Sequence, residues 1–148
     1  MLAGDFHYNT GTPISVHSTN YYDGFSAVYV NIVADCKLTT GTRKLFQPYL
    51  NTNCFQNPTG YALGNGGNYQ SQVRNPGFAS EDLSAHKSMA MGPNGRYTFT
   101  FRAEFFNIFN RNVLAGPDTN MADATFGQII NYGGLGGRVG QLGARLTF

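Results

Sequence analysis

Hydrophobic and polar residues alternate with a period of two in four segments of this chain, at residues 2–18, 81–91, 96–109 and 138–148. Because successive side chains of a β-strand point to opposite faces, this period predicts strands with one apolar and one polar face. Segment 96–109 shows it most clearly, with the apolar residues Tyr97, Phe99, Phe101, Ala103, Phe105 and Phe109 on one face. The pattern predicts an all-β chain, an antiparallel meander of strands longer than the usual five or six residues.

The connections between these segments differ greatly in length. Gly92-Pro93-Asn94-Gly95 predicts a tight reversal between the second and third segments. Residues 19–77 and 110–136 are rich in Gly, Asn, Pro and Asp, and we expect two long loop regions there. Within the first, residues 25–34 are rich in Val, Ile and Tyr and predict one further strand. We expect residues 1–148 to form a single β module.

Composition excludes several classes of protein. Charged residues make up 12% of the chain, aromatic residues 14%, and the net charge is +2. Such a chain is neither disordered nor suited to nucleic acid, because its aromatic content is high and its basic residues are few and scattered. No apolar run approaches the roughly 18 residues of a transmembrane helix. Residues 1–6 lack the basic start and apolar stretch of a signal peptide, so we expect any export signal to be encoded elsewhere.

The alternation identifies the apolar face but not what covers it. Long strands joined alternately by short turns and long polar loops are typical of an outer-membrane β-barrel, whose apolar rows face lipid and whose polar rows face a wet lumen. This interpretation assigns four side chains to the lumen, namely Arg102, Glu104, Gln141 and Arg145. The soluble alternative is a secreted β-sandwich in which a second sheet covers Phe99, Phe101 and Phe105.

The number of predicted strands limits both interpretations. Four clear strands, or five to six with residues 25–34 and a partner, fall short of the roughly eight that the smallest closed barrel needs. An open sheet edge is costly in hydrocarbon, since water is not there to bond its backbone groups. We therefore expect a piece of a larger barrel, or a chain that pairs its edges with other chains.

Residues with the spacing of common catalytic or metal sites are not found in the sequence. The three histidines, His7, His17 and His86, lie far apart, and no nucleophile elbow, phosphate loop or zinc-protease motif occurs. Glu81 and Asp82 are adjacent, so on a strand they point to opposite faces and cannot act as a carboxylate pair. We expect no enzymatic activity, no metal and no cofactor.

The two cysteines, Cys36 and Cys54, lie 18 residues apart in a Thr- and Asn-rich region without a CxxC motif. This spacing favours one disulfide formed in an oxidising compartment. Two unrelated free thiols are the alternative.

Several stretches occur in the order found at the C-terminal end of TonB-dependent outer-membrane receptors, namely Gly11–Val16, Asn75–Phe78, Asp82–Lys87, Phe101–Asn110, Phe126–Ile129 and Gly140–Phe148. The chain resembles the Oar-like branch, whose full-length members carry an N-terminal carboxypeptidase-regulatory-like domain and a plug. The resemblance spans nearly all 148 residues. It implies a C-terminal barrel segment in the outer membrane of a Gram-negative bacterium. The whole receptor would take up a bulky nutrient, and this segment alone would not be competent for transport.

The resemblance also implies roles for particular residues. The outer-membrane assembly machinery would read a C-terminal signal made of Leu142, Ala144, Leu146 and Phe148. Lipid or a partner would meet Tyr97, Phe99, Phe101, Phe105 and Phe109. The long loops would lie outside the cell and carry candidate sugar- or peptide-stacking groups, namely Tyr21, Tyr22, Tyr49, Tyr61 and Tyr69. Loop packing is the alternative role for these tyrosines.

A second function fits the same open sheet. The chain could be a subunit of an extracellular fibre at the cell surface, in which each copy completes its sheet with a strand of the next. The partners expected are thus the remainder of a barrel or other copies, together with outer-membrane lipid and the assembly machinery.

Overall fold

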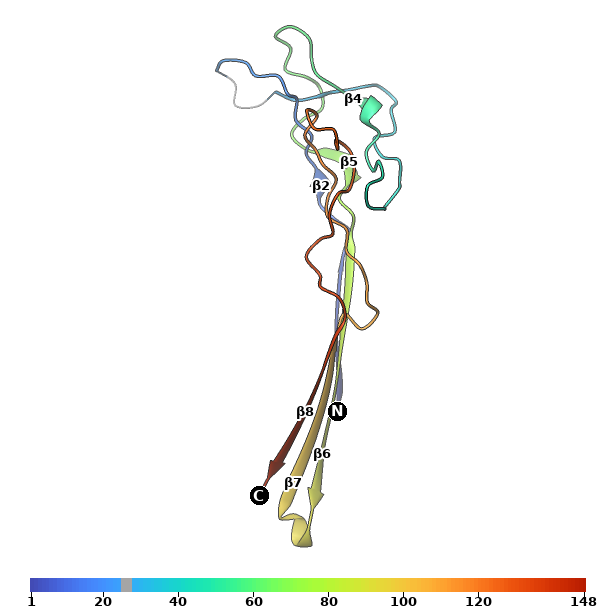
Figure 1. Cartoon of the computed structure of the whole chain (residues 1–148). Helices are drawn as coiled ribbons and strands as arrows, with labels where there is room; N and C mark the ends of the chain where they lie inside the picture. The colour runs from blue at the N-terminus through green and yellow to red at the C-terminus, as the bar shows by residue number, and fades with distance from the viewer. Residues whose placement is uncertain (25–27) are drawn as a thin grey trace. The chain divides into compact units, whose positions relative to one another are not determined.

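The structure is a computed structural model that describes residues 1–24 and 28–148 (Figure 1). Its described strands are β1 (Leu2–Asn9), β2 (Pro13–Ile14), β3 (Asn31–Ile32), β4 (Phe55–Gln56), β5 (Gln70–Arg74), β6 (Phe78–Met91), β7 (Tyr97–Phe106) and β8 (Val139–Thr147). Two 3-10 turns, η1 (Thr52–Cys54) and η2 (Pro93–Gly95), accompany them. None of the helices in the described ranges has the length and hydropathy needed to span a bilayer.

The long strands form one four-stranded sheet in the order β1-β6-β7-β8. Strands β6 and β7 are antiparallel and are joined through η2, as the Gly92–Gly95 sequence predicts. Strand β8 is antiparallel to β7, and Met1 and His86 exchange backbone hydrogen bonds where β1 begins beside β6. The three strands β6, β7 and β8 run side by side in Figure 1. The prediction of an all-β antiparallel fold is confirmed.

Two strands end earlier than predicted. Strand β7 ends at Phe106 rather than at residue 109, because Asn107 has a positive φ of 50° that turns the chain out of the sheet. Phe109 is therefore not part of the apolar row of β7. Strand β1 ends at Asn9, before Gly11, whose φ of 83° suits glycine and whose Cα lies against the Asn75 carbonyl.

The predicted strand at 25–34 lies partly outside the described residues, since 25–27 are not among them. In the part that is described, regular pairing is confined to β3 at Asn31–Ile32, opposite Gln56 and Phe55 of β4. Val28 and Val30 nevertheless are buried, whereas Val33 is exposed, so part of this segment contributes to a core.

The described chain divides into two compact units. The strand unit comprises Met1–Asn9, Ala79–Asn112 and Leu135–Phe148 and holds the four-stranded sheet. The loop unit comprises Thr10–Phe78 and Val113–Gly134 and holds the two small sheets, β2-β5 and β3-β4. The long segment at 19–77 that was predicted to be loop is thus mostly irregular backbone, yet it belongs to a unit with its own core.

The core of the loop unit is small and apolar. It contains Ile14, Val16, Val30, Leu38, Tyr49, Leu50, Cys54, Phe55, Val73 and Ile129. A disulfide joins Cys36 to Cys54, with the two Cα atoms 5.6 Å apart, and so ties the surface segment at Cys36 to this core. The irregular backbone around the core is satisfied by side chains, for example by the Gln70 amide, which accepts a hydrogen bond from the Val16 N–H at 2.8 Å.

Candidate functional site

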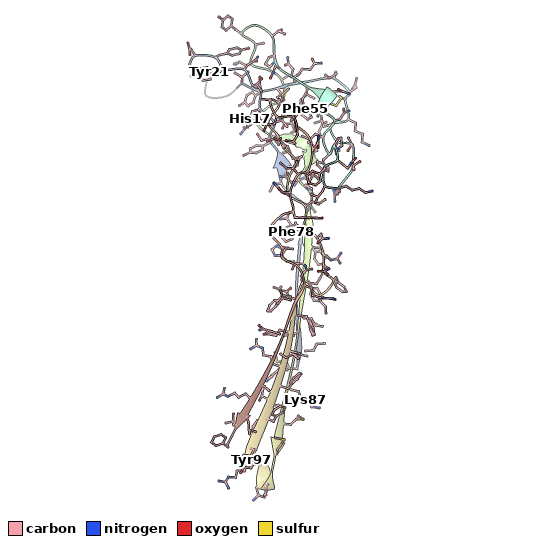
Figure 2. All side chains as sticks on the ribbon, viewed as in Figure 1. His17, Tyr21, Phe55, Phe78, Lys87 and Tyr97 are labelled. Atoms are coloured by element: carbon pink, nitrogen blue, oxygen red, sulfur yellow. A yellow bond between two sulfur atoms is a disulfide. The ribbon has the colours of Figure 1, made fainter. Side chains whose placement is uncertain are left out.

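The two faces of the four-stranded sheet differ sharply in chemistry. Cross-strand partners along β6, β7 and β8 form apolar rows on one face, such as Met89, Phe99 and Leu146. On the other face the corresponding rows are polar, such as Ser84, Glu104 and Gln141. The alternation read in the sequence therefore stays in phase across three strands, because the register pairs apolar with apolar positions. Figure 2 shows side chains projecting from both faces of these strands.

The sheet does not bury its apolar face. Among the described residues, every buried apolar side chain belongs to the loop unit, whereas Phe101 and Phe105 of β7 are each 40% exposed. A β-sandwich would have to cover these rings with a second sheet, so the secreted sandwich alternative is wrong for this chain. A row of exposed aromatic and aliphatic side chains on long strands needs a non-aqueous neighbour, and lipid is the neighbour that outer-membrane strands meet.

The polar face carries a small network of charged and amide groups. Arg102 forms an ion pair with Glu104, and the Gln141 amide donates to the same carboxylate. Ser88 and Thr100, directly opposite each other on β6 and β7, share a hydrogen bond of 3.0 Å. Arg145 lies opposite Thr100 on the other side, so it belongs to the same face. All four side chains predicted to face a lumen are thus on one face of the sheet.

Lys87 is the exception to the apolar rows. It lies on β6 opposite Phe101, between Ala85 and Met89 on the same face, near the end of the strand that leads to the turn (Figure 2). The Lys87 side chain is exposed, and a lysine on an apolar face can keep its aliphatic stem on apolar surface while its ammonium group reaches a polar boundary. The period-two pattern already places Lys87 on this face, because it shares the parity of Ala85 and Met89.

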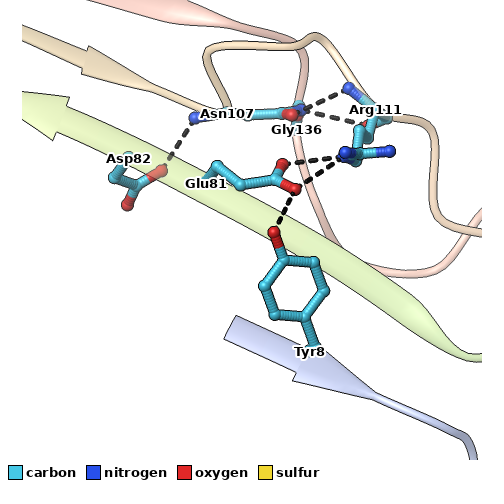
Figure 3. Close-up of polar contacts among 6 residues, drawn as sticks. All are labelled: Tyr8, Glu81, Asp82, Asn107, Arg111 and Gly136. Atoms are coloured by element: carbon cyan, nitrogen blue, oxygen red, sulfur yellow. Dashed lines mark hydrogen bonds and ion pairs between the residues drawn. The ribbon is translucent and has the colours of Figure 1, made fainter. Parts of the chain in front are cut away.

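At the opposite end of the sheet a polar cluster joins β1, β6 and the chain that follows β7 (Figure 3). We call it the rim clasp, and it consists of Tyr8, Glu81, Asp82, Asn107, Arg111 and Gly136. The Glu81 carboxylate is only 1% exposed. It accepts hydrogen bonds from Nε of Arg111 at 2.7 and 3.0 Å and from the Tyr8 hydroxyl at 2.9 Å. A buried carboxylate is tolerated here because an opposite charge and hydrogen bonds compensate it.

Asn107 is the second centre of the rim clasp. Its buried amide donates to the carbonyls of Arg111 and Gly136, each at 3.0 Å, and accepts from the Arg111 N–H at 2.8 Å. Its own N–H donates to the Asp82 carboxylate at 2.8 Å. Arg111 and Gly136 stand at the two ends of the second long connection, so the Asn107 side chain bonds both ends of it (Figure 3). The Asn110 side chain adds an exposed hydrogen bond there, which it accepts from the Arg138 N–H at 3.0 Å.

The sequence did not predict which side chains bond Glu81 and Asp82. The adjacent Glu81 and Asp82 were correctly placed on opposite faces of a strand, since one bonds Arg111 and the other bonds the Asn107 backbone. Their partners lie 25 to 73 residues away, and no local pattern links them. One signal in the sequence could have revealed the partner. Glu81 occupies a position on the apolar face of its strand, and a carboxylate there needs a partner.

The predicted stacking tyrosines separate into two groups. Tyr49 is only 4% exposed, and its hydroxyl donates to the Arg74 carbonyl at 2.5 Å, so it is a core residue and not a stacking group. The rings of Tyr22 and Tyr61 lie 5.6 Å apart and come together from positions 39 residues apart. Tyr21, Tyr61 and Tyr69 are exposed, so they are accessible to a ligand.

The residues of the predicted C-terminal signal, Leu142, Ala144, Leu146 and Phe148, are exposed, as is Phe109, whereas Tyr97 is half-buried. Leu142, Leu146 and Phe148 project from the last strand and from the residue after it. Phe109 lies beyond β7, with its ring 5.5 Å from the Arg111 guanidinium carbon. The described part of the chain contains no group of three or more His, Cys, Asp and Glu side chains able to hold a metal ion.

Comparison with known proteins agrees with this geometry. The family described as outer membrane beta barrel domain matches residues 1–141 of the chain. No curated protein matches it, and no solved structure does. The match covers nearly the whole of a chain whose long strands are antiparallel and expose one apolar face. The chain therefore belongs to the outer membrane beta barrel domain family, and its place is the outer membrane.

Proposed function

We propose that this chain is the C-terminal barrel segment of a TonB-dependent outer-membrane transporter that takes up a bulky nutrient. The observation that carries the proposal is the open sheet β1-β6-β7-β8, which exposes an apolar row on one face and carries a polar network on the other. Four strands cannot enclose a lumen, so the segment contributes a wall and is not competent for transport alone.

The edge strands of this sheet are β1 and β8. In hydrocarbon each edge must be paired, since an unpaired backbone group costs several kcal/mol there. Further strands of the same barrel supply these partners in the proposal, with lipid against the apolar rows. The exposed terminal side chains of β8 and Phe148 then serve as the signal that the assembly machinery reads.

The connections support an orientation in the membrane. Strands β6 and β7 are joined by the three-residue turn η2, whereas the opposite strand ends lead into the long segments of the loop unit. Outer-membrane barrels place short turns in the periplasm and long loops outside the cell. The loop unit is thus the part that meets incoming nutrient, and its disulfide suits that oxidising side.

The experiment is to measure the particle size of the purified chain with and without detergent. We expect a small detergent-bound particle and aggregation when detergent is removed, because the apolar rows need an apolar solvent. A regular, SDS-resistant polymer in water would contradict the proposal and favour the fibre of exchanged strands. In cells, a crosslinker at the β8 edge should capture a strand of the same polypeptide, and uptake by the complete protein should stop without TonB.

A further inference from the structure

A groove of about 630 Å³ lies in the loop unit. One wall is residues 32–38, which contains Cys36 of the disulfide, and the other is residues 65–72, which runs into β5. Its volume is in the range of about 300–1,000 Å³ that is typical of small-molecule sites. The comparisons assign no ligand to it, and the strand rows and the rim clasp do not include it.

Side chains hold the two walls in a fixed relation. Asn65 accepts a hydrogen bond from the Ile32 N–H at 2.7 Å and donates to the Ile32 carbonyl at 3.2 Å, so it fastens one wall to the other. The buried Gln70 amide donates to the carbonyls of Gly66 and Gly67, each at 3.2 Å. A ligand would not need to order these segments on binding, which removes part of the entropic cost of association.

The disulfide fixes the wall at residues 32–38 to the core of the loop unit. Cys36 is partly exposed beside the groove, while its partner Cys54 is fully buried in the core of the loop unit. The Cys54 N–H is bonded to the Asn51 carbonyl, and the Val33 N–H is bonded to the Cys54 carbonyl at 3.0 Å. The wall that carries residues 33–37 is therefore anchored by one covalent bond and by backbone hydrogen bonds.

The groove lining combines one aromatic face with neutral and charge-balanced polar groups. Tyr69 is 64% exposed within the lining. Ser71 and Gln72 follow it on the same wall, and Asp35 and Lys37 are exposed on the other. In the described part of the chain the polar atoms of these last four side chains have no hydrogen-bond or ion-pair partner. One carboxylate and one ammonium leave the lining without a net charge.

These features select the ligand chemistry. A pyranose ring offers an apolar C–H face to an aromatic ring, and its hydroxyls both donate and accept hydrogen bonds. An amide, a hydroxyl, a carboxylate and an ammonium on facing walls match such hydroxyls better than they match an anion or an apolar chain. We propose that the groove binds a neutral oligosaccharide, with Tyr69 stacked on a sugar ring and Gln72, Asp35 and Lys37 bonded to its hydroxyls.

This inference rests on the proposed function, because it names the class of nutrient that the exposed loops would capture. The test uses the full chain in lauryldimethylamine oxide, a detergent without a sugar headgroup, and an array of neutral oligosaccharides. Binding of the strongest sugar is then titrated by calorimetry. Tyr69→Ala should weaken it by roughly tenfold or more, through lost stacking. Tyr69→Phe should retain it, since the ring remains.

Tyr132→Ala is the matched control, because Tyr132 is an exposed tyrosine of the same unit that does not line the groove. It should leave the affinity unchanged. Circular dichroism of all three variants checks that they fold. Absence of any neutral sugar ligand, equal affinity of Tyr69→Ala, or Tyr69-dependent binding of extended peptides in place of sugars would overturn the proposal.

The two proposals fail separately. Polymers that form without detergent would contradict the transporter and leave a measured sugar affinity standing. A detergent-dependent chain that binds no sugar would overturn the groove proposal alone.

Discussion

The carboxylate of Glu81 and the guanidinium of Arg111 form an ion pair of 2.7 Å in which the carboxylate is almost completely buried. The hydrogen bond to Glu81 raises the pKa of Arg111 above its ordinary value, so the guanidinium stays charged throughout the physiological range. The strand unit thus buries an acid while it exposes phenylalanines, which reverses the polarity of a water-soluble domain.

Replacement of Glu81 should loosen the chain that follows β7. In Glu81→Gln the charge that holds Arg111 is lost, so we expect backbone amides at residues 107–111 to exchange roughly tenfold faster with solvent deuterium. Glu81→Ala should have a larger effect, because it also leaves the Tyr8 hydroxyl without its acceptor. Hydrogen exchange with mass spectrometry in detergent measures both.

Glu104→Gln is the control for this prediction. Its carboxylate is paired on the polar face of β7 and is not part of the rim clasp. Exchange at 107–111 that rises equally in Glu104→Gln would show that the Glu81–Arg111 pair has no specific role there.

The Asn107 side chain should contribute more to the stability of the fold than the Asn110 side chain. Both residues have positive φ, 50° and 52°, so alanine imposes a similar backbone strain at each. The Asn107 amide is buried and bonded to both ends of the second long connection, whereas the Asn110 side chain accepts one exposed hydrogen bond, from the Arg138 N–H. We expect Asn107→Ala to lower the free energy of unfolding by about 1–3 kcal/mol more than Asn110→Ala, because three hydrogen bonds of a buried amide are lost in place of one exposed bond. Urea unfolding in micelles measures the difference, and equal losses would argue against the clasp.

Reduction of the disulfide should destabilise the loop unit. The Cys36–Cys54 bond closes a loop with a sequence separation of 18 residues, and a loop of that size contributes about 3 kcal/mol by restricting the unfolded chain. We expect dithiothreitol to lower the urea midpoint followed by tyrosine fluorescence. The variant with both cysteines replaced by alanine should be less stable and insensitive to the reductant. A wild-type midpoint that ignores reductant would contradict the prediction.

A cation on the apolar face should weaken membrane association. Phe99 lies between Met89 and Leu146, so Phe99→Arg places a guanidinium among apolar side chains. At the centre of a bilayer this costs about 2–4 kcal/mol, and less near the surface. Flotation with phospholipid vesicles should show a lower bound fraction for this variant.

Thr98→Arg is the matched control, one residue away on the polar face between Ala90 and Thr147. We expect it to float like the wild-type chain. If both variants lose binding equally, the assignment of the two faces to lipid and lumen is wrong.

Alternation in the sequence determined most of the strand unit. Tyr97, Phe99 and Phe101 alternate with Thr98 and Thr100. Because successive side chains of a strand point to opposite faces, this alternation shows which side chains share a face. The tight turn at Gly92–Gly95 followed from residues that favour left-handed backbone. These are local properties, and the structure agrees with them.

Tertiary structure decided what depends on partners distant in the sequence. Tyr49 and Tyr69 are both tyrosines in a turn-rich segment. Tyr49 is buried and donates a hydrogen bond to the Arg74 carbonyl, whereas Tyr69 is exposed and lines a groove. Glu81 is buried and differs from the exposed carboxylates because Arg111 and Tyr8 reach it from other parts of the chain. Periodicity fixes the direction of a side chain, whereas burial depends on what the rest of the chain brings against it.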